Sequence, residues 1–344
     1  MKLDYYAWCC NLESDSGEGI LAEKYLKNLS LARKLNIKAF SPEINIHYKS
    51  GKKIFIKKKK NNLFFFKNKY LLPFYGIFFL WKNFFQKKKL IYVNYLPLWN
   101  TLTILFLPPN TIMGPITGSV NINDKKNLSG LVRTYIFPIL YRVNLRLMLI
   151  RNKKILFSTS ILKKYISREN LNKCYFNFLN YLFKYEKFNK NKKNIDFLIY
   201  YRKHSNKYSN FHINFINKIV HKNKVVLFGD KLNIKGVINL NKISRKKVLS
   251  LLKRTKNSIS GDDNLYSLYN IDCLKNGVII FFNKRMKVFL DVYNKKNYLP
   301  INFDDNNLNL FKKKINQRKL FTKTKNKFFS DLDKKINKYF LTIS

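Results

Sequence analysis

The sequence predicts an α/β protein built from two Rossmann-like domains that face an interdomain cleft. Residues 2–8 form a first strand, residues 13–19 a polar loop with two glycines, and a helix with apolar residues at helical spacing follows. Residues 195–282 alternate strands and helices of the length typical of a parallel sheet covered on both faces. Between these parts, residues 184–194 are charged, polar and nearly without aliphatic side chains, which indicates a linker.

These observations set the expected domain boundaries. The 344 residues suit two domains of ordinary size. We expect an N-terminal domain over 1–183, a linker over 184–194 and a C-terminal domain over 195–295. The remaining segment, 296–344, reads as a basic helical tail that packs back on the N-terminal domain.

The expected elements of the first domain follow from periodicity and turn residues. Strands are expected near 37–47, 53–57, 90–94, 110–113 and 154–158, and helices near 70–87, 98–107, 127–150 (bent at Pro138) and 160–186.

The net charge is strongly positive but ambiguous. Lys and Arg total 68 against 19 acids, which gives +49. Such a charge usually indicates nucleic acid or an anionic surface as partner. The excess is mostly Lys beside many Asn, Ile, Phe and Tyr, as an AT-rich genome produces, and Arg is scarce by comparison. Three interpretations stay open: a Lys-rich surface whose charge has no function, peripheral contact with an anionic membrane, and nucleic-acid binding. No sequence-specific nucleic-acid partner is expected.

The cysteines and histidines indicate a reducing compartment without a metal site. No cysteine pair has CxxC spacing among Cys9, Cys10, Cys174 and Cys273. The histidines are too scattered for a cluster, at His47, His204, His212 and His221.

No secretory signal or membrane span is expected. The N-terminus reaches an acidic run before any apolar stretch of signal-peptide length. The longest apolar stretch, 91–109, is interrupted by asparagines and prolines and reads as a strand, a turn and a short buried helix. We therefore expect a cytoplasmic protein.

Residues 255–282 carry the most specific pattern. A short strand at 257–260 runs into a Gly-Asp-Asp-Asn turn, and an apolar-striped helix, Gly277 and a second strand follow. This segment resembles the donor site of two-Rossmann-domain glycosyltransferases, the GT-B class, where an acid in the turn and another one helix-length later face the nucleotide-sugar.

The resemblance implies roles for residues of this segment. Many retaining GT-B enzymes carry two glutamates with seven residues between them. Here Asp272 stands at the second position. Asn264 has the spacing of the family but is not an acid, whereas Asp263 is an acid but lies one residue too far from Asp272. Either residue can therefore fill the first position. Ser267 on the same segment is a further polar residue that could contact the donor. The alternative is that Asp262 or Asp263 only caps the helix.

The other donor residues follow the first strands of the second domain. Arg202 ends the first strand and Lys207 follows, where GT-B enzymes place an Arg/Lys pair on the diphosphate. A Lys-rich surface loop would look similar, so Arg202 is the sharper candidate. Gly229 ends the next strand and is a further donor-site candidate.

Candidate acceptor-side residues lie in the first domain. Gly17 and Gly19 permit close backbone approach, and Glu18 is either an acceptor base or the second member of a capping box with Asp15. The segments 94–100 and 114–118 resemble those of a glycosyltransferase family of AT-rich marine alphaproteobacteria. They contribute Asn94, Gly114, Thr117 and Gly118 to the expected cleft, although plain turn geometry would also explain the two glycines.

The resemblance implies a metal-independent glycosyltransferase that needs no cofactor. Its partners would be a nucleotide-sugar donor and a glycan or lipid-linked acceptor of envelope polysaccharide synthesis, at the inner face of the plasma membrane. The pair Asp331 and Asp333 reads as helix N-terminal acids rather than a metal site. Two alternatives remain: a basic RNA-binding or ribosome-associated protein, and an α/β scaffold without catalysis.

Overall fold

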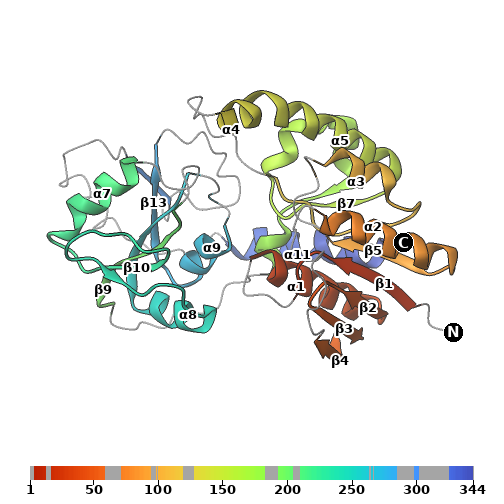
Figure 1. Cartoon of the computed structure of the whole chain (residues 1–344), viewed down its shortest axis with the longest axis horizontal. Helices are drawn as coiled ribbons and strands as arrows, with labels where there is room; N and C mark the ends of the chain where they lie inside the picture. The colour runs from red at the N-terminus through yellow and green to blue at the C-terminus, as the bar shows by residue number, and fades with distance from the viewer. Residues whose placement is uncertain are drawn as a thin grey trace. The chain divides into compact units, whose positions relative to one another are not determined.

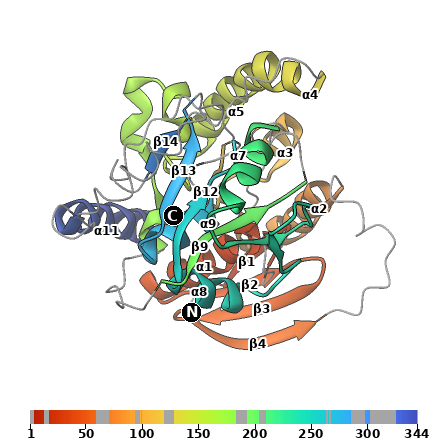
Figure 2. The ribbon, with the colours of Figure 1, turned by 90° about the vertical axis from the view of Figure 1, so that its left-hand side faces the viewer.

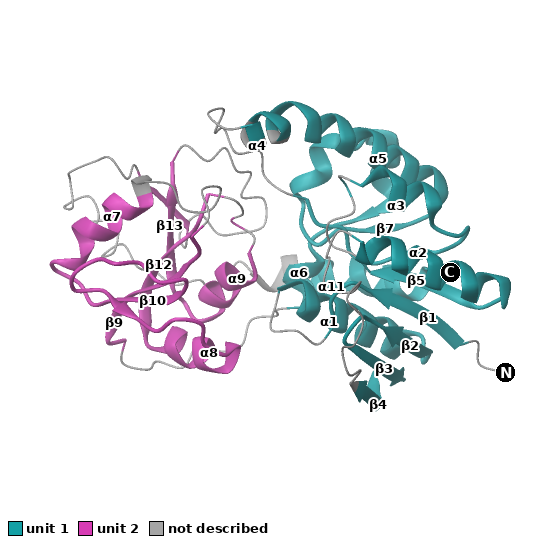
Figure 3. Cartoon of the chain, in the orientation of Figure 1, with its two compact units in different colours: residues 1–118, 127–182, 329–344 teal, residues 119–126, 183–328 magenta. Residues whose placement is uncertain are grey.

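The chain forms two compact units, which are described separately. Unit 1 comprises residues 1–118, 127–182 and 329–344, and unit 2 comprises 119–126 and 183–328 (Figure 3). The computed structural model describes residues 4–12, 17–58, 71–93, 98, 100–118, 128–182, 193–203, 210–262, 265, 267–284, 298–301 and 325–343.

Unit 1 contains a mixed sheet in the order β4-β3-β2-β1-β5-β6 (Figure 1). Its strands are β1 (Asp4–Cys9), β2 (Asn36–Phe40), β3 (Ile44–Lys49), β4 (Lys52–Lys58), β5 (Lys89–Val93) and β6 (Ile112–Met113). Strands β2, β1, β5 and β6 are parallel to one another. Strands β3 and β4 add an antiparallel hairpin next to β2, at one edge of the sheet. A parallel bridge between Ile116 and Phe157 leads on to the pair β7 (Ile155–Leu156) and β8 (Cys174–Tyr175).

The helices of unit 1 bury two aromatic-rich cores. They are α1 (Gly17–Ala32), α2 (Leu72–Phe85), α3 (Thr101–Phe106), α4 (Leu128–Leu131), α5 (Phe137–Arg151), α6 (Phe178–Leu182) and α11 (Lys325–Thr342), with short 3₁₀ turns at Ile161–Tyr165 and Arg168–Lys173. Helices α2, α3 and α5 share one core with β1 and β5, which includes Trp8, Ile77, Ile104 and Tyr141. Among the described residues no helix is both long and apolar enough to cross a membrane.

The second core joins the end of the chain to its beginning. Tyr25 of α1, Phe178 of α6 and Phe340 of α11 meet with ring centroids 5.8 to 6.0 Å apart. The hydroxyls of Tyr25 and Tyr339 lie 3.2 Å apart, fully buried. Helix α11 therefore packs within unit 1, on α1 and α6.

Unit 2 is a parallel sheet in the order β11-β10-β9-β12-β13-β14 (Figure 2). Its strands are β9 (Ile195–Tyr201), β10 (Val225–Gly229), β11 (Ile238–Asn239), β12 (Thr255–Ile259), β13 (Ile279–Asn283) and β14 (Tyr298–Ile301). The described helices are α7 (Asn210–Val220), α8 (Arg245–Lys253) and α9 (Leu268–Lys275). Strands with both faces covered read as apolar runs, and Phe197, Ile199 and Phe281 are accordingly fully buried.

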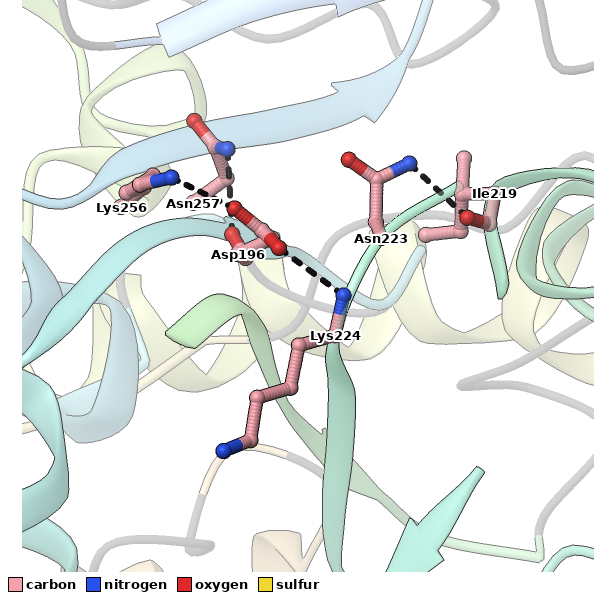
Figure 4. A network of polar contacts seen from close by, with 6 residues as sticks. All are labelled: Asp196, Ile219, Asn223, Lys224, Lys256 and Asn257. Carbon is pink, nitrogen blue, oxygen red and sulfur yellow. Dashed lines mark hydrogen bonds and ion pairs between the residues drawn. The ribbon is translucent and has the colours of Figure 1, made fainter. Parts of the chain in front are cut away.

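Polar contacts fix the register at the amino ends of these strands (Figure 4). Asp196 of β9 accepts hydrogen bonds from the ammonium of Lys256 at 2.7 Å and from the backbone N–H of Lys224 at 2.9 Å. Asn257 of β12 donates to the carbonyl of Asp196 at 3.0 Å. Burial raises the pKa of Asp196, but the hydrogen bonds from Lys256 and Lys224 outweigh it and the net shift is downward. One carboxylate thus joins β9, β10 and β12.

Four elements differ from the sequence-based expectation. The helices expected near 160–186 are two 3₁₀ turns, the short strand β8 and the short helix α6. The strand expected near 37–47 is two strands, because residues 41–43 turn the chain back. The bend expected at Pro138 is a π-helical turn, η3 (Val132–Ile136), directly before it; proline lacks an N–H and crowds the carbonyl four residues earlier. Residues 298–301, expected in a helical tail, form β14 and extend the second sheet.

The buried tyrosine pair yields a test of the contact between α1 and α11. Tyr25→Phe or Tyr339→Phe alone should lower the free energy of unfolding by about 1–3 kcal/mol, because each leaves one buried hydroxyl without its partner. The double variant should cost less than the sum of the two. Tyr181→Phe is the control, since its hydroxyl contacts Asn337 at an exposed position. Additive losses in urea unfolding would contradict the pairing.

Candidate functional site

The most informative place in unit 2 is the carboxyl edge of its sheet between β9 and β12. The chain passes from β9 to β10 on one side and later returns to β12 on the other. In open α/β sheets, ligands bind outside the carboxyl ends of strands at such a reversal of strand order. Residues directly after β9, β10 and β12 are therefore the candidates.

The ends of β9 and β10 are held together by backbone contacts. Gly229 has φ +105°, and a Cβ there would lie 2.2 Å from the carbonyl oxygen of Tyr201, so only glycine fits. Asp230 accepts a hydrogen bond from the backbone N–H of Lys203 at 2.8 Å, and its own N–H donates to Tyr201 at 3.0 Å. The exposed Arg202 follows β9 directly and shares this fixed turn.

Three elements hold the loop after β12. His212 of α7 donates from Nε2 to the carbonyl of Ser260 at 3.2 Å. Asn270 of α9 donates to the Ser260 hydroxyl at 2.8 Å and to the carbonyl of Leu265 at 3.0 Å. Tyr298 of β14 donates to the same Leu265 carbonyl at 2.9 Å. The described parts of this loop are thereby anchored from α7, α9 and β14 before any ligand arrives.

His212 is a neutral hydrogen-bond donor at neutral pH. The residue is fully buried, and burial lowers its pKa to about 4 despite the opposing hydrogen bond to Ser260. Its Nε2 also lies 3.5 Å from a carboxylate oxygen of Asp262. Because a carbonyl oxygen only accepts, Nε2 carries the proton. The ring therefore positions the start of the turn at Gly261.

Helix α9 presents two of the predicted donor residues in different roles. Ser267 is the N-cap, accepting from the N–H of Asn270 at 3.2 Å. Asp272 is only 4% exposed, and both its carboxylate oxygens lie 2.9 Å from a guanidinium nitrogen of Arg245 at the start of α8. Burial raises the pKa of Asp272 to about 6, against the lowering effect of Arg245, so the carboxylate is ionised at neutral pH.

Unit 1 has a corresponding reversal at β1, which lies between β2 and β5. Helix α1 begins at Gly17, so Gly17, Glu18 and Gly19 form its first turn rather than part of a loop. Glu18 lies near the carboxyl end of β1: burial raises the pKa of the Cys10 thiol to about 12, and the charge of Glu18 adds to that rise. A carboxylate in the first helical turn also interacts favourably with the helix dipole.

The 114–118 segment is fixed by packing inside unit 1. A Cβ on Gly114 would lie 3.0 Å from Val93, and one on Gly118 would lie 2.4 Å from the buried Leu162. The hydroxyl of Thr117 donates to that of Ser158 at 2.9 Å. The close packing explains both glycines without a ligand.

Other candidates fall outside the described residues or change place. Asn94, Lys207, Asp263 and Asn264 lie outside the described residues, as does Asp15 of the expected capping box. The two acids Asp331 and Asp333 lie in the second and third turns of α11, not at its N-terminus. Within the described ranges, no group of three or more His, Cys, Asp or Glu side chains is placed to hold a metal ion.

Sequence reasoning missed the residues that support the site. Arg245, Asn270 and Tyr298 act across 27, 10 and 33 residues of sequence, and nothing in local spacing marks such pairs. His212 is one of four scattered histidines, and its spacing gives no sign of its contact with Ser260, 48 residues away. Asp230 did have a signal, because an acid directly follows the strand-end Gly229.

The two buried titratable groups give a pH test. The raised pKa of Asp272 makes stability fall as pH rises from 3.8 to about 6, because the folded protein holds the extra proton there. The lowered pKa of His212 acts oppositely, and its contribution is lost as pH falls from 6.5 to about 4. In wild type the two effects oppose each other.

We therefore expect single variants to have opposite pH slopes. Relative to wild type, Asp272→Asn should gain unfolding free energy between pH 4 and 6, and His212→Gln should lose it, each by on the order of 3 kcal/mol. Urea unfolding at half-unit pH steps measures both. Variant curves parallel to wild type would show that neither group titrates as burial requires.

No protein-family model and no curated protein matches the sequence. Solved structures do match. TarM aligns with a TM-score of 0.51 and 11% identity over 99% of this chain and 95% of that chain. A glycosyltransferase from Rickettsia africae ESF-5 gives 0.48 and 14% over 99% and 93%, and a variant of S. aureus TarM gives 0.47 and 13% over 87% and 65% of the two chains. The likeness confirms the predicted fold class: two α/β units with parallel sheets, the GT-B architecture.

Proposed function

We propose that this protein is a glycosyltransferase that moves a sugar from a nucleotide-sugar donor to a glycan or lipid-linked acceptor in envelope polysaccharide or lipopolysaccharide synthesis. The observation that carries the proposal is the carboxyl edge of the second sheet. There an exposed arginine, a glycine-dependent turn and an anchored loop before a helix N-terminus meet at the reversal of strand order.

On the donor side, Arg202 with Lys207 would neutralise the leaving diphosphate. Guanidinium groups suit this task because they form paired hydrogen bonds to phosphate oxygens. Gly229 would let the backbone approach, and Ser267 would present the N-terminus of α9 to the diphosphate. Such preorganised charge stabilises a leaving group without rearrangement during the reaction.

Sugar and ribose hydroxyls would be held by Asp263 or Asn264 together with Asp272. Asp272 lies five residues after the N-cap of α9, about one and a half helical turns. Its ionised carboxylate, kept charged beside Arg245, is an acceptor for hydroxyl hydrogen bonds.

The acceptor would lie at the carboxyl edge of the first sheet. Glu18 stands in the first turn of α1, flanked by Gly17 and Gly19, and is the candidate base for the acceptor hydroxyl. The segments with Asn94 and with Gly114, Thr117 and Gly118 complete this side of the proposal. Their resemblance to a family of AT-rich marine alphaproteobacteria belongs to the same proposal.

A donor-binding test follows from Arg202. Arg202→Ala should weaken UDP binding by about 1.5–3 kcal/mol, the range for a hydrogen bond to a charged group, which is roughly 10- to 150-fold in Kd. Titration calorimetry with UDP, ADP and GDP measures it. Arg254→Ala is the matched control, because Arg254 contacts Asn194 at the amino edge of the same sheet. Equal losses in both variants would reject the site.

A second test separates chemistry from helix packing at Asp272. Asp272→Asn should lower sugar transfer by about 100-fold or more, as expected for a lost transition-state contact. Arg245→Lys keeps a cation beside Asp272 but loses the guanidinium geometry of the same ion pair, and it should lower transfer much less. Melting temperatures of both variants are compared with wild type. Equal activity losses that follow the loss of melting temperature would assign Asp272 to packing alone.

The net charge of +49 favours one alternative, RNA binding. An RNA-binding protein would copurify with nucleic acid, which would raise the ratio of ultraviolet absorbance of nucleic acid to that of protein in the purified sample. Its affinity for RNA would fall steeply with salt, whereas UDP binding in unit 2 would be absent.

A further inference from the structure

Three neighbouring helices of unit 1 expose apolar side chains on their outer faces. On α2, Phe78 and Phe85 are 73% and 76% exposed and stand seven residues apart, two turns along one stripe. Helix α3 exposes Leu102, Leu105 and Phe106. Helices α2, α3 and α5 share one core beneath them, so these exposed side chains lie on the opposite, outer faces of that layer.

The third helix continues the same surface with alternating apolar and basic residues. Ile139 is 61% exposed, and Arg142, Val143, Arg146 and Ile150 follow it at helical spacing, all exposed. Polar contacts join the layer: the indole of Trp81 on α2 donates to the carbonyl of Phe106 at 2.7 Å, and Arg151 at the end of α5 donates to carbonyls at the end of α3. We call the outer faces of α2, α3 and α5 the apolar–basic face.

This concentration is unusual for a monomer surface. Extended exposed apolar patches mark interaction sites, whereas isolated exposed apolar residues are ordinary. Among the described residues of unit 2, the exposed large apolar side chain is Ile238. Exposed large apolar side chains are therefore a feature of unit 1, where they also occur on the edge strand β4 (Ile54, Phe55 and Ile56), and not of the described chain in general.

Charge identifies the partner. Residues 71–118 and 128–151 contain no Asp or Glu, whereas Lys82, Arg142 and Arg146 lie exposed within the apolar–basic face. A second copy of this chain would bring like charges together without an acid to compensate them. An anionic lipid surface satisfies both components, because acyl chains accept the apolar side chains and headgroups pair with the cations.

We propose that the apolar–basic face seats unit 1 on an anionic bilayer, with Phe78 and Ile139 entering the acyl boundary and Arg142 and Arg146 at the headgroups. No described helix crosses a membrane, so this contact is interfacial. The inference does not rest on the proposed glycosyl transfer, since none of these residues takes part in nucleotide binding.

The test uses the full chain and vesicles of phosphatidylcholine with or without phosphatidylglycerol. Phe78→Ser with Ile139→Ser should lower the partition onto anionic vesicles by at least about tenfold, because burial of each apolar side chain contributes about that factor. This double variant leaves the net charge unchanged. Leu341→Ser is the control, an equally exposed apolar residue (61%) on α11, and should bind as wild type.

A second variant separates the two components. Arg142→Gln with Arg146→Gln should remove most of the preference for anionic over neutral vesicles. Brominated acyl chains should quench the fluorescence of Trp81, measured as the difference from Trp81→Phe, in wild type but not in Phe78→Ser with Ile139→Ser. Unchanged melting temperature and unchanged circular dichroism confirm that each variant is folded.

Two outcomes would overturn the proposal. If Phe78→Ser with Ile139→Ser binds anionic vesicles as wild type does, the attraction is only the diffuse charge of the Lys-rich surface. If this double variant instead converts a lipid-free dimer into a monomer in sedimentation velocity, the face is an interface between copies.

Discussion

The place of the first strand in each sheet is the constraint on which the rest depends. β1 lies between β2 and β5, and β9 lies between β10 and β12. Because parallel strands need crossover connections, the segment after β9 crosses to one side of the second sheet and the segment after β12 crosses to the other. In open α/β sheets, ligands bind at the carboxyl edge where strand order reverses, and residues distant in sequence meet at that edge. The strand order alone therefore places a candidate ligand site at the carboxyl edge of each sheet.

The second sheet uses its two edges differently. At the amino edge, Asp196 is paired with Lys256 and with a backbone N–H, which fixes the register of three strands. At the carboxyl edge, the polar groups that hold the loop are neutral: a histidine whose pKa is lowered, an asparagine and a tyrosine hydroxyl. Neutral anchors cost less to bury than charges. Arg202, directly after β9, is exposed at the same edge.

The fold class could be predicted because apolar periodicity and turn residues are local properties of the sequence. Failures occurred where a distant contact decides the structure. Residues 298–301 read as part of a basic helical tail, but pairing with β13 makes them the edge strand β14, a position that tolerates Pro300. Gly17 and Gly19 read as loop glycines in the sequence, but they open α1. Asp272 was recognised as a special acid, but its partner Arg245 lies 27 residues away in another helix and has no local signal.

The same distinction applies to charge. A net charge of +49 does not distinguish a Lys-rich surface without a binding function from a polyanion-binding surface, because the total does not say where the charged side chains lie. Position becomes informative when acids are considered as well: in unit 1, Asp4 and Glu23 pair with Lys38 and Lys53 on the β2–β4 side of the sheet. The helical layer of α2, α3 and α5 has basic and apolar side chains but no acid in its sequence segments. Water solvates lysine well but not exposed phenylalanine. A composition bias therefore explains why both residue types are abundant, but not why Phe78 and Phe85 stand exposed. The coincidence of the two side-chain types on one layer, rather than the size of the charge, is what indicates a partner with both an anionic and an apolar part.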